Sequence, residues 1–140
     1  MKNDKFNTYI SRIENAIGSR IFSCYFKNKE NVTENGGLAC ASFVSNILLT
    51  MGWIKEGHVT VSSTITDLLK SGWDYTDTPQ KGDIIIWKEW KYGTHDHIGF
   101  FIDQKTAISN SELNSFPIFH SLDYYGIRPP KQFLTRQNWE

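Results

Sequence analysis

Cysteine is scarce in this sequence. Cys24 and Cys40 are the two cysteines among 140 residues, and no C-x-x-C pair occurs. Two cysteines are too few for a disulfide-based scaffold, and without C-x-x-C spacing a structural zinc site or a dithiol redox motif is not indicated. A single bridge between the two is the minor alternative. A chain of this length buries enough apolar surface to fold without such links.

An excess of charge is also lacking. Lys and Arg together number 15, as do Asp and Glu, so the formal net charge is zero at neutral pH. Binding to nucleic acid by neutralising phosphates requires a surplus of cations, so we expect no nucleic-acid partner.

Long hydrophobic runs are the third absence. No segment approaches the roughly 20 apolar residues of a membrane span, and residues 1–18 lack the apolar block of a signal peptide. We therefore expect a chain made in the cytoplasm, with no membrane partner, that reaches any target outside the cell by another route.

Hydrophobic periodicity predicts a helical first half. Apolar residues at helical spacing predict helices over about 6–17 and 40–51, each followed by a glycine. A third helix is predicted to start in the cluster 62–64, with Asp67 as the capping-box acid for the threonine of that cluster, and to close at Gly72.

The second half changes to the pattern of strands. Strands are predicted over 83–87, 97–102, 106–110 and 117–121, with the second and third forming a hairpin. Helices followed by antiparallel strands are typical of an α+β fold, and residues 1–140 are expected to form one domain.

Cys40 occupies a position at which a thiol can be activated. It lies in the segment GGLACASFV (36–44), where a glycine-rich loop becomes a helix. Backbone N–H groups and the positive end of the helix dipole favour a thiolate there. A nearby histidine would complete the activation as a thiolate–imidazolium pair. The alternative is a buried, inert cysteine, since free cysteine is among the most buried residue types.

His97 is the candidate base. It opens the predicted strand 97–102, and a histidine at that position can face the first turn of a helix packed on the sheet. The alternative is a surface histidine, because the polar residues 94–96 precede it.

A third group should orient the imidazole of His97. The strand 106–110 ends level with the start of its hairpin partner, which places Ser109 or Asn110 beside the ring. Asn110 is preferred because its side-chain carbonyl accepts a hydrogen bond, whereas Ser109 suits an unbulged register slightly better. His120, one strand further on, is the third candidate.

The histidines also suggest a metal site. His95 and His97 alternate and so share one face of a strand, and His58 and His120 are further imidazoles. No third ligand stands at a diagnostic spacing, and a catalytic use of His97 explains the same cluster. We therefore expect neither a metal ion nor a cofactor.

Two aromatic residues, Trp90 and Tyr92, lie in the polar insertion between the strands 83–87 and 97–102. Aromatic side chains more often fill a core, but on a loop they can contact a peptide or a glycan. These two are our candidates for substrate contact.

Three motifs follow one another between about residues 36 and 110. The first is a cysteine that begins a helix and is followed by a small residue and then Ser-Phe-Val. The second is KGDIIIW and the third is HIGFFI. In this order they resemble the NlpC-type and CHAP-type peptidases of the papain-like superfamily. The resemblance implies a papain-like fold, with the cysteine helix packed on an antiparallel sheet. It also implies Cys40 as nucleophile, His97 as base and a polar orienting residue near 109–110. The implied activity is hydrolysis of amide bonds in bacterial cell-wall (peptidoglycan) peptides.

The sequence departs from that family pattern near the cysteine. Ala39 replaces the usual Asp, the pair 41–42 is Ala-Ser rather than Ser-Gly, and Ser109 aligns with a position that is most often His. These departures indicate a divergent member, for which a substrate other than the usual one stays open. Acyltransferase or thioesterase chemistry, and an inactive binding module with the same fold, stay open as alternatives.

Overall fold

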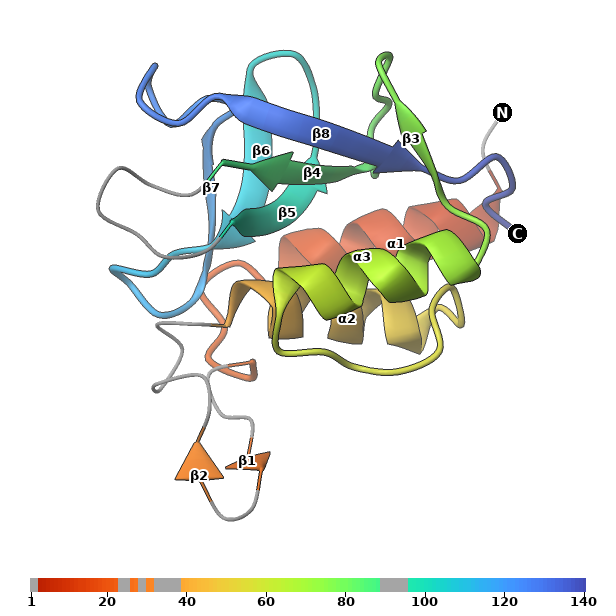
Figure 1. The fold of residues 1–140 in the computed structure, drawn as a ribbon, viewed down its shortest axis with the longest axis horizontal. Helices are drawn as coiled ribbons and strands as arrows, with labels where there is room; N and C mark the ends of the chain where they lie inside the picture. Colours follow the sequence, from red (N-terminus) through yellow and green to blue (C-terminus); the bar gives the residue numbers. More distant parts are fainter. Residues whose placement is uncertain (1–2, 23–25, 28–29, 32–38, 89–95) are drawn as a thin grey trace.

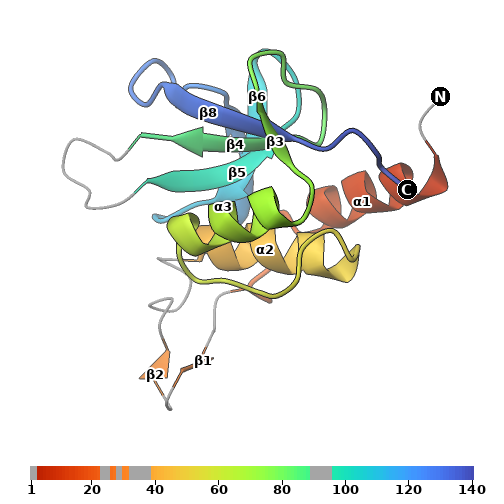
Figure 2. The same ribbon diagram turned by 45° about the vertical axis from the view of Figure 1, so that its right-hand side comes forward.

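The computed structural model describes residues 3–22, 26–27, 30–31, 39–88 and 96–140. Within these ranges the chain forms three helices, a six-stranded sheet and a separate two-stranded sheet (Figures 1 and 2). The helices are α1 (Asp4–Asn15), α2 (Cys40–Thr50) and α3 (Val61–Lys70). The strands of the main sheet are β3 (Asp74–Thr76), β4 (Ile84–Trp87), β5 (His97–Phe101), β6 (Thr106–Asn110), β7 (Pro117–Ser121) and β8 (Pro130–Thr135). The short strands β1 (Phe26–Lys27) and β2 (Glu30–Asn31) pair with each other.

The predicted α+β fold is confirmed, with its cysteine at the start of a helix. All three predicted helices and all four predicted strands are present. Among the described residues, no helix is both long and apolar enough to cross a membrane.

Two strands of the main sheet, β3 and β8, were not predicted from the sequence. The sheet order is β3-β8-β4-β5-β6-β7, and every neighbouring pair is antiparallel. The last strand of the chain, β8, is therefore inserted between β3 and β4. Pro130 opens β8, which is a position where a strand tolerates proline.

The helices cover one face of the sheet, as Figures 1 and 2 show. This face carries the main core, in which side chains of alternate strand positions pack against the helices: Ile84, Ile86, Ile98, Phe100, Ile108 and Leu134. The opposite face carries a smaller cluster around Trp87, which Leu122 and Tyr124 from the β7–β8 connection cover. The sheet is therefore buried on both sides at β4 and β5.

Helix α3 begins differently from the prediction. Its N-cap is Thr60, whose side-chain oxygen accepts a hydrogen bond from the Ser63 N–H at 3.1 Å. The predicted capping box at residues 62–64 is wrong, because the helix starts earlier and Asp67 then lies beyond its first turn.

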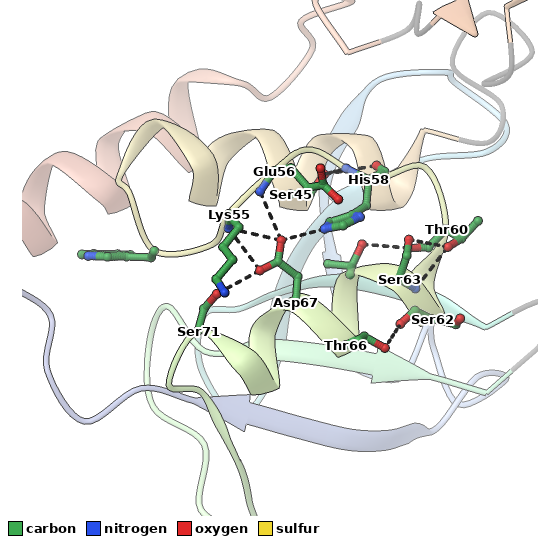
Figure 3. A network of polar contacts seen from close by, with 12 residues as sticks. Ser45, Lys55, Glu56, His58, Thr60, Ser62, Ser63, Thr66, Asp67 and Ser71 are labelled. Carbon is green, nitrogen blue, oxygen red and sulfur yellow. Dashed lines mark hydrogen bonds and ion pairs between the residues drawn. The ribbon is translucent and has the colours of Figure 1, made fainter.

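Asp67 instead forms hydrogen bonds that hold the loop between α2 and α3 in place (Figure 3). Its carboxylate accepts hydrogen bonds from two backbone N–H groups, from a hydroxyl and from an imidazole, supplied by Lys55, Glu56, Ser71 and His58. The His58 Nε2 atom lies 2.7 Å from a carboxylate oxygen. This buried carboxylate therefore stabilises a loop and borders a cavity of about 650 Å³ that Lys55, Ser62 and Lys70 also line.

An aromatic cluster joins the two ends of the chain. Trp139 stacks on Tyr9 of α1 at 5.7 Å between ring centroids and packs edge-on against Phe6 at 5.2 Å. The Tyr9 hydroxyl donates a hydrogen bond to the carbonyl of Gly82 at 2.6 Å. Helix α1, the turn before β4 and the C-terminal tail are thereby packed into one unit.

Candidate active site

Cys40 is the first residue of α2, where the thiol is nearly buried, with 8% of the residue exposed. Burial raises the pKa of the Cys40 thiol to about 11, while hydrogen bonds from the backbone N–H groups of Ile98 and Ala41 act in the opposite direction. The expected favouring of a thiolate by the helix N-terminus is therefore outweighed by desolvation. At neutral pH the sulfur carries its proton unless a base removes it.

His97 begins β5 and is almost fully buried, with 1% of the residue exposed. The backbone N–H of the next residue, Ile98, lies near the Cys40 sulfur and acts to lower the pKa of the thiol. The strand that His97 opens therefore packs against the helix that Cys40 opens. The imidazole packs against the Trp87 ring at 5.2 Å and against the Tyr124 ring at 5.9 Å. The alternative of a surface histidine is excluded by this burial.

Ser109 of β6 makes the hydrogen bond to the imidazole. Its Oγ lies 3.0 Å from Nε2 of His97. The register pairs Gly99 with Ser109, and His97 reaches diagonally past the glycine. A β-carbon at position 99 would lie 2.6 Å from the Ser109 Cβ and 2.9 Å from a ring atom of Trp87. The missing side chain at Gly99 is what allows this close approach.

Asn110 lies on the other face of β6. Successive residues of a strand point to opposite sides, so Asn110 shares the helix-covered face with Ile108 while Ser109 shares the face of His97. The ring contact that we expected of Asn110 is made by Ser109. The unbulged register of the hairpin is the sequence signal that favours this outcome.

His120, the third candidate, belongs to the same hydrogen-bonded chain. Its Nε2 lies 2.7 Å from Ser109 Oγ, and its Nδ1 lies 2.7 Å from the carbonyl oxygen of Ser121. A carbonyl oxygen can accept but not donate, so Nδ1 carries the proton. Burial lowers the pKa of His120, which favours the neutral ring with an accepting Nε2.

The protonation of His120 determines which group donates and which accepts in the hydrogen bonds that link His97, Ser109 and His120. Because its Nε2 accepts, Ser109 donates its single hydroxyl proton to His120. Ser109 then accepts from His97, which places the proton of the neutral His97 ring on Nε2 and makes Nδ1 the basic nitrogen. The arrangement thus orients one imidazole through a serine and a second imidazole.

Sequence reasoning missed three further residues of this site. Trp87 was recognised as part of a buried strand, but its ring also contacts His97 and His120. The glycine of HIGFFI signals a close approach between strands, although not to which residue. For Tyr124, whose hydroxyl lies 2.7 Å from Ser109 Oγ, the sequence offers no signal.

Four residues discussed from the sequence lie outside the described residues: Cys24, Trp90, Tyr92 and His95. Their predicted roles stay predictions. In the part of the chain that the structure describes, no three His, Cys, Asp or Glu side chains gather closely enough to hold a metal ion.

Comparison with known proteins places this site in a family. Residues 30–114 match the CHAP domain, and this segment includes Cys40, His97 and Ser109. A search of curated proteins gave no match. Since the matched segment covers more than half of the sequence and the helix-on-sheet fold agrees with it, the chain belongs to the CHAP domain family of papain-like amidases and peptidases.

Proposed function

We propose that this protein is a cysteine hydrolase that cleaves amide bonds in bacterial peptidoglycan peptides, with Cys40 as nucleophile and His97 as base. CHAP domains act on peptidoglycan, which supports the substrate class. The observation that carries the proposal is local: the Ile98 N–H, next to His97, lies near enough to the Cys40 sulfur to act on its pKa, and Ser109 engages Nε2 of the His97 ring, which leaves Nδ1 for the thiol.

The reaction begins with proton transfer from the Cys40 thiol to Nδ1 of His97. The thiolate attacks the amide carbonyl, and the resulting oxyanion accepts a hydrogen bond from the Cys40 backbone N–H at the start of α2. The imidazolium then gives its proton to the leaving amine, which breaks the C–N bond and leaves a thioester. Water, deprotonated by His97, hydrolyses the thioester and restores the thiol.

His97 has a larger part here than in a site with a preformed thiolate. With the thiol pKa at about 11, little thiolate exists at neutral pH without the imidazole. The Nε2 proton stays on His97 throughout the cycle, so the bond to Ser109 persists in both charge states of the ring. Ser109 therefore keeps Nδ1 directed to the reaction in each step.

Digestion of purified peptidoglycan tests the proposal. We expect the wild-type protein to release fragments with new amine termini, detected by amine labelling and mass analysis, and Cys40→Ala to release none while retaining its fold. Cys24→Ala, which changes the other cysteine, is the matched control and should retain activity.

Two outcomes would overturn the proposed function. Equal release by wild type and Cys40→Ala would remove Cys40 from the reaction. Fragments without new amine termini, or acyl transfer to an added amine without hydrolysis, would replace peptide hydrolysis by different acyl chemistry at the same thiol.

A further inference from the structure

We propose that Tyr124 is a positioning residue of this site, which acts through Ser109, together with His120, to fix which nitrogen of His97 carries the proton. The inference deepens the proposed function and rests on it.

Ser109 Oγ has three partners and one proton. His97 Nε2 lies at 3.0 Å, His120 Nε2 at 2.7 Å and the Tyr124 hydroxyl at 2.7 Å. A hydroxyl donates one hydrogen bond and accepts two. The proton goes to His120, whose other nitrogen donates to a carbonyl, so the remaining two partners must both donate. Tyr124 therefore donates its O–H to Ser109 and occupies the second lone pair.

This donation removes the alternative orientations of the serine. If the serine proton turned toward Tyr124 or His97, the accepting Nε2 of His120 would face a lone pair in a buried site, which is costly. With both lone pairs of Ser109 engaged, the hydroxyl proton is confined to the direction of His120. The His97 ring then finds an acceptor, and never a donor, at its Nε2.

The backbone holds Tyr124 in a strained conformation. Tyr124, Tyr125 and Gly126 have φ angles of 53°, 60° and 87° in succession, and the first two are positions where a side chain makes this conformation unfavourable. Strain of this kind persists where surrounding contacts maintain it, and it gathers at functional sites. The β7–β8 connection thus bends sharply at the residue whose hydroxyl enters the site.

Contacts made by the ring of Tyr124 hold this strained backbone conformation in place. The ring stacks on His120 at 4.1 Å with 21° between the planes and packs edge-on against Trp87 at 5.3 Å. The guanidinium of the buried Arg128 lies over it at 6.0 Å and donates to the carbonyl of Lys88 at 2.7 Å. These contacts fix the position of the Tyr124 ring, so its hydroxyl contacts Ser109 in a single geometry.

Tyr125 provides a matched control within the same loop. It has the same side chain and the same left-handed backbone, but 81% of the residue is exposed. Replacing either tyrosine with phenylalanine removes one hydroxyl and leaves the ring. We expect Tyr124→Phe to lower kcat about tenfold with little change in KM, and Tyr125→Phe to leave both unchanged.

The closing experiment reads the tautomer directly and needs no substrate. Nitrogen NMR of protein with ¹⁵N-labelled histidine, recorded above the ordinary histidine pKa of about 6.5, should show His97 protonated on Nε2. In Tyr124→Phe the spectrum should shift toward a mixture of tautomers, whereas Tyr125→Phe should match the wild type. Because the measurement is independent of turnover, failure of the proposed peptidoglycan activity would not be confused with failure of this inference.

Three results would overturn the inference. The first is a wild-type His97 protonated on Nδ1, which requires no variant. The second is a Tyr124→Phe protein with the wild-type tautomer and kcat, or equal losses in both tyrosine variants. The third is an undiminished effect of Tyr124→Phe on kcat when Ser109→Ala is already present, because a residue that acts through Ser109 loses its effect without it.

Discussion

At the level of single residues, the protonation state of Cys40 decides whether the proposed reaction starts. Burial raises the pKa of the thiol to about 11. A group with a raised pKa becomes reactive as pH rises toward that value, so an isolated Cys40 would react slowly with alkylating agents at neutral pH. Proton transfer to His97 provides the route to a nucleophile below that pH.

His97→Gln should expose this dependence. In a Cys24→Ala background, the rate of alkylation of Cys40 by iodoacetamide at neutral pH should fall by about 100-fold, the lower range of general-base contributions. The midpoint of the rate against pH should move toward about 11. Unchanged alkylation of the variant would contradict the role of His97 as base, and thermal unfolding would check that the variant is folded.

The positions of Cys40 and His97 were predictable from sequence because each residue begins an element. A glycine-rich segment before an apolar helical stripe indicates where α2 starts, and a histidine before a buried run indicates the start of β5. The orienting residue was harder, because one residue of register separates Ser109 from Asn110 and moves the side chain to the opposite face. Chemical preference favoured Asn110, whereas the pairing of Gly99 with Ser109 decides the contact.

At the level of elements, the site depends on how closely β5 and β6 approach each other at Gly99. A β-carbon there would lie 2.6 Å from Ser109 Cβ and 2.8 Å from the carbonyl oxygen of Ile108. Both atoms belong to the paired strand, so the strands themselves would have to separate. Such overpacking typically costs about 1–3 kcal/mol.

We therefore expect Gly99→Ala to lower the free energy of unfolding by about 1–3 kcal/mol and to lower kcat of the folded protein, because Ser109 is displaced from His97. Denaturant unfolding and peptidoglycan digestion measure the two effects. Gly57→Ala is the control, since the nearest neighbours of a β-carbon there are atoms of one side chain, Asn46, from 3.1 Å, and no atom of a paired strand. Wild-type stability and activity in Gly99→Ala would refute the close-approach argument.

The elements that sequence predicted are those with strong local signals. Helix α2 has an apolar stripe, and β4 is a buried run between polar turns. Strands β3 and β8 lack such signals, because β3 has three residues and β8 starts with proline and has partly buried positions. Their pairing joins segments far apart in the chain, which local patterns do not encode.

At the level of the whole molecule, two buried groups make folding sensitive to acid. Burial raises the pKa of Asp67, but hydrogen bonds from His58, Lys55, Ser71 and Glu56 outweigh it, and the pKa is lowered overall. The resulting stabilisation is present above the ordinary value of about 3.9 and is lost as pH falls through the lower folded value. His120, whose pKa burial lowers, acts earlier, since the unfolded chain takes up its proton below about pH 6.5.

Asp67→Asn should separate these contributions. At neutral pH we expect the variant to lose about 1–3 kcal/mol of unfolding free energy, because it loses a charged acceptor of several hydrogen bonds. The difference from wild type should shrink as the pH falls from the ordinary carboxyl value of about 3.9 through the lower folded pKa of Asp67, while the earlier decline due to His120 remains. Denaturant unfolding across pH measures both, with the exposed Asp77→Asn as control, expected within about 0.5 kcal/mol of wild type. A constant difference at every pH would contradict an ionised Asp67.

The aromatic contact between Trp139 and α1 has a consequence for attachment. It brings the beginning of α1 and the C-terminal tail to the same side of the molecule, whereas α2 begins, with Cys40, at the opposite end (Figure 1). A polypeptide fused to either end would leave the molecule from the side away from the thiol. A segment attached at either end would therefore leave the approach of the proposed substrate to Cys40 unobstructed.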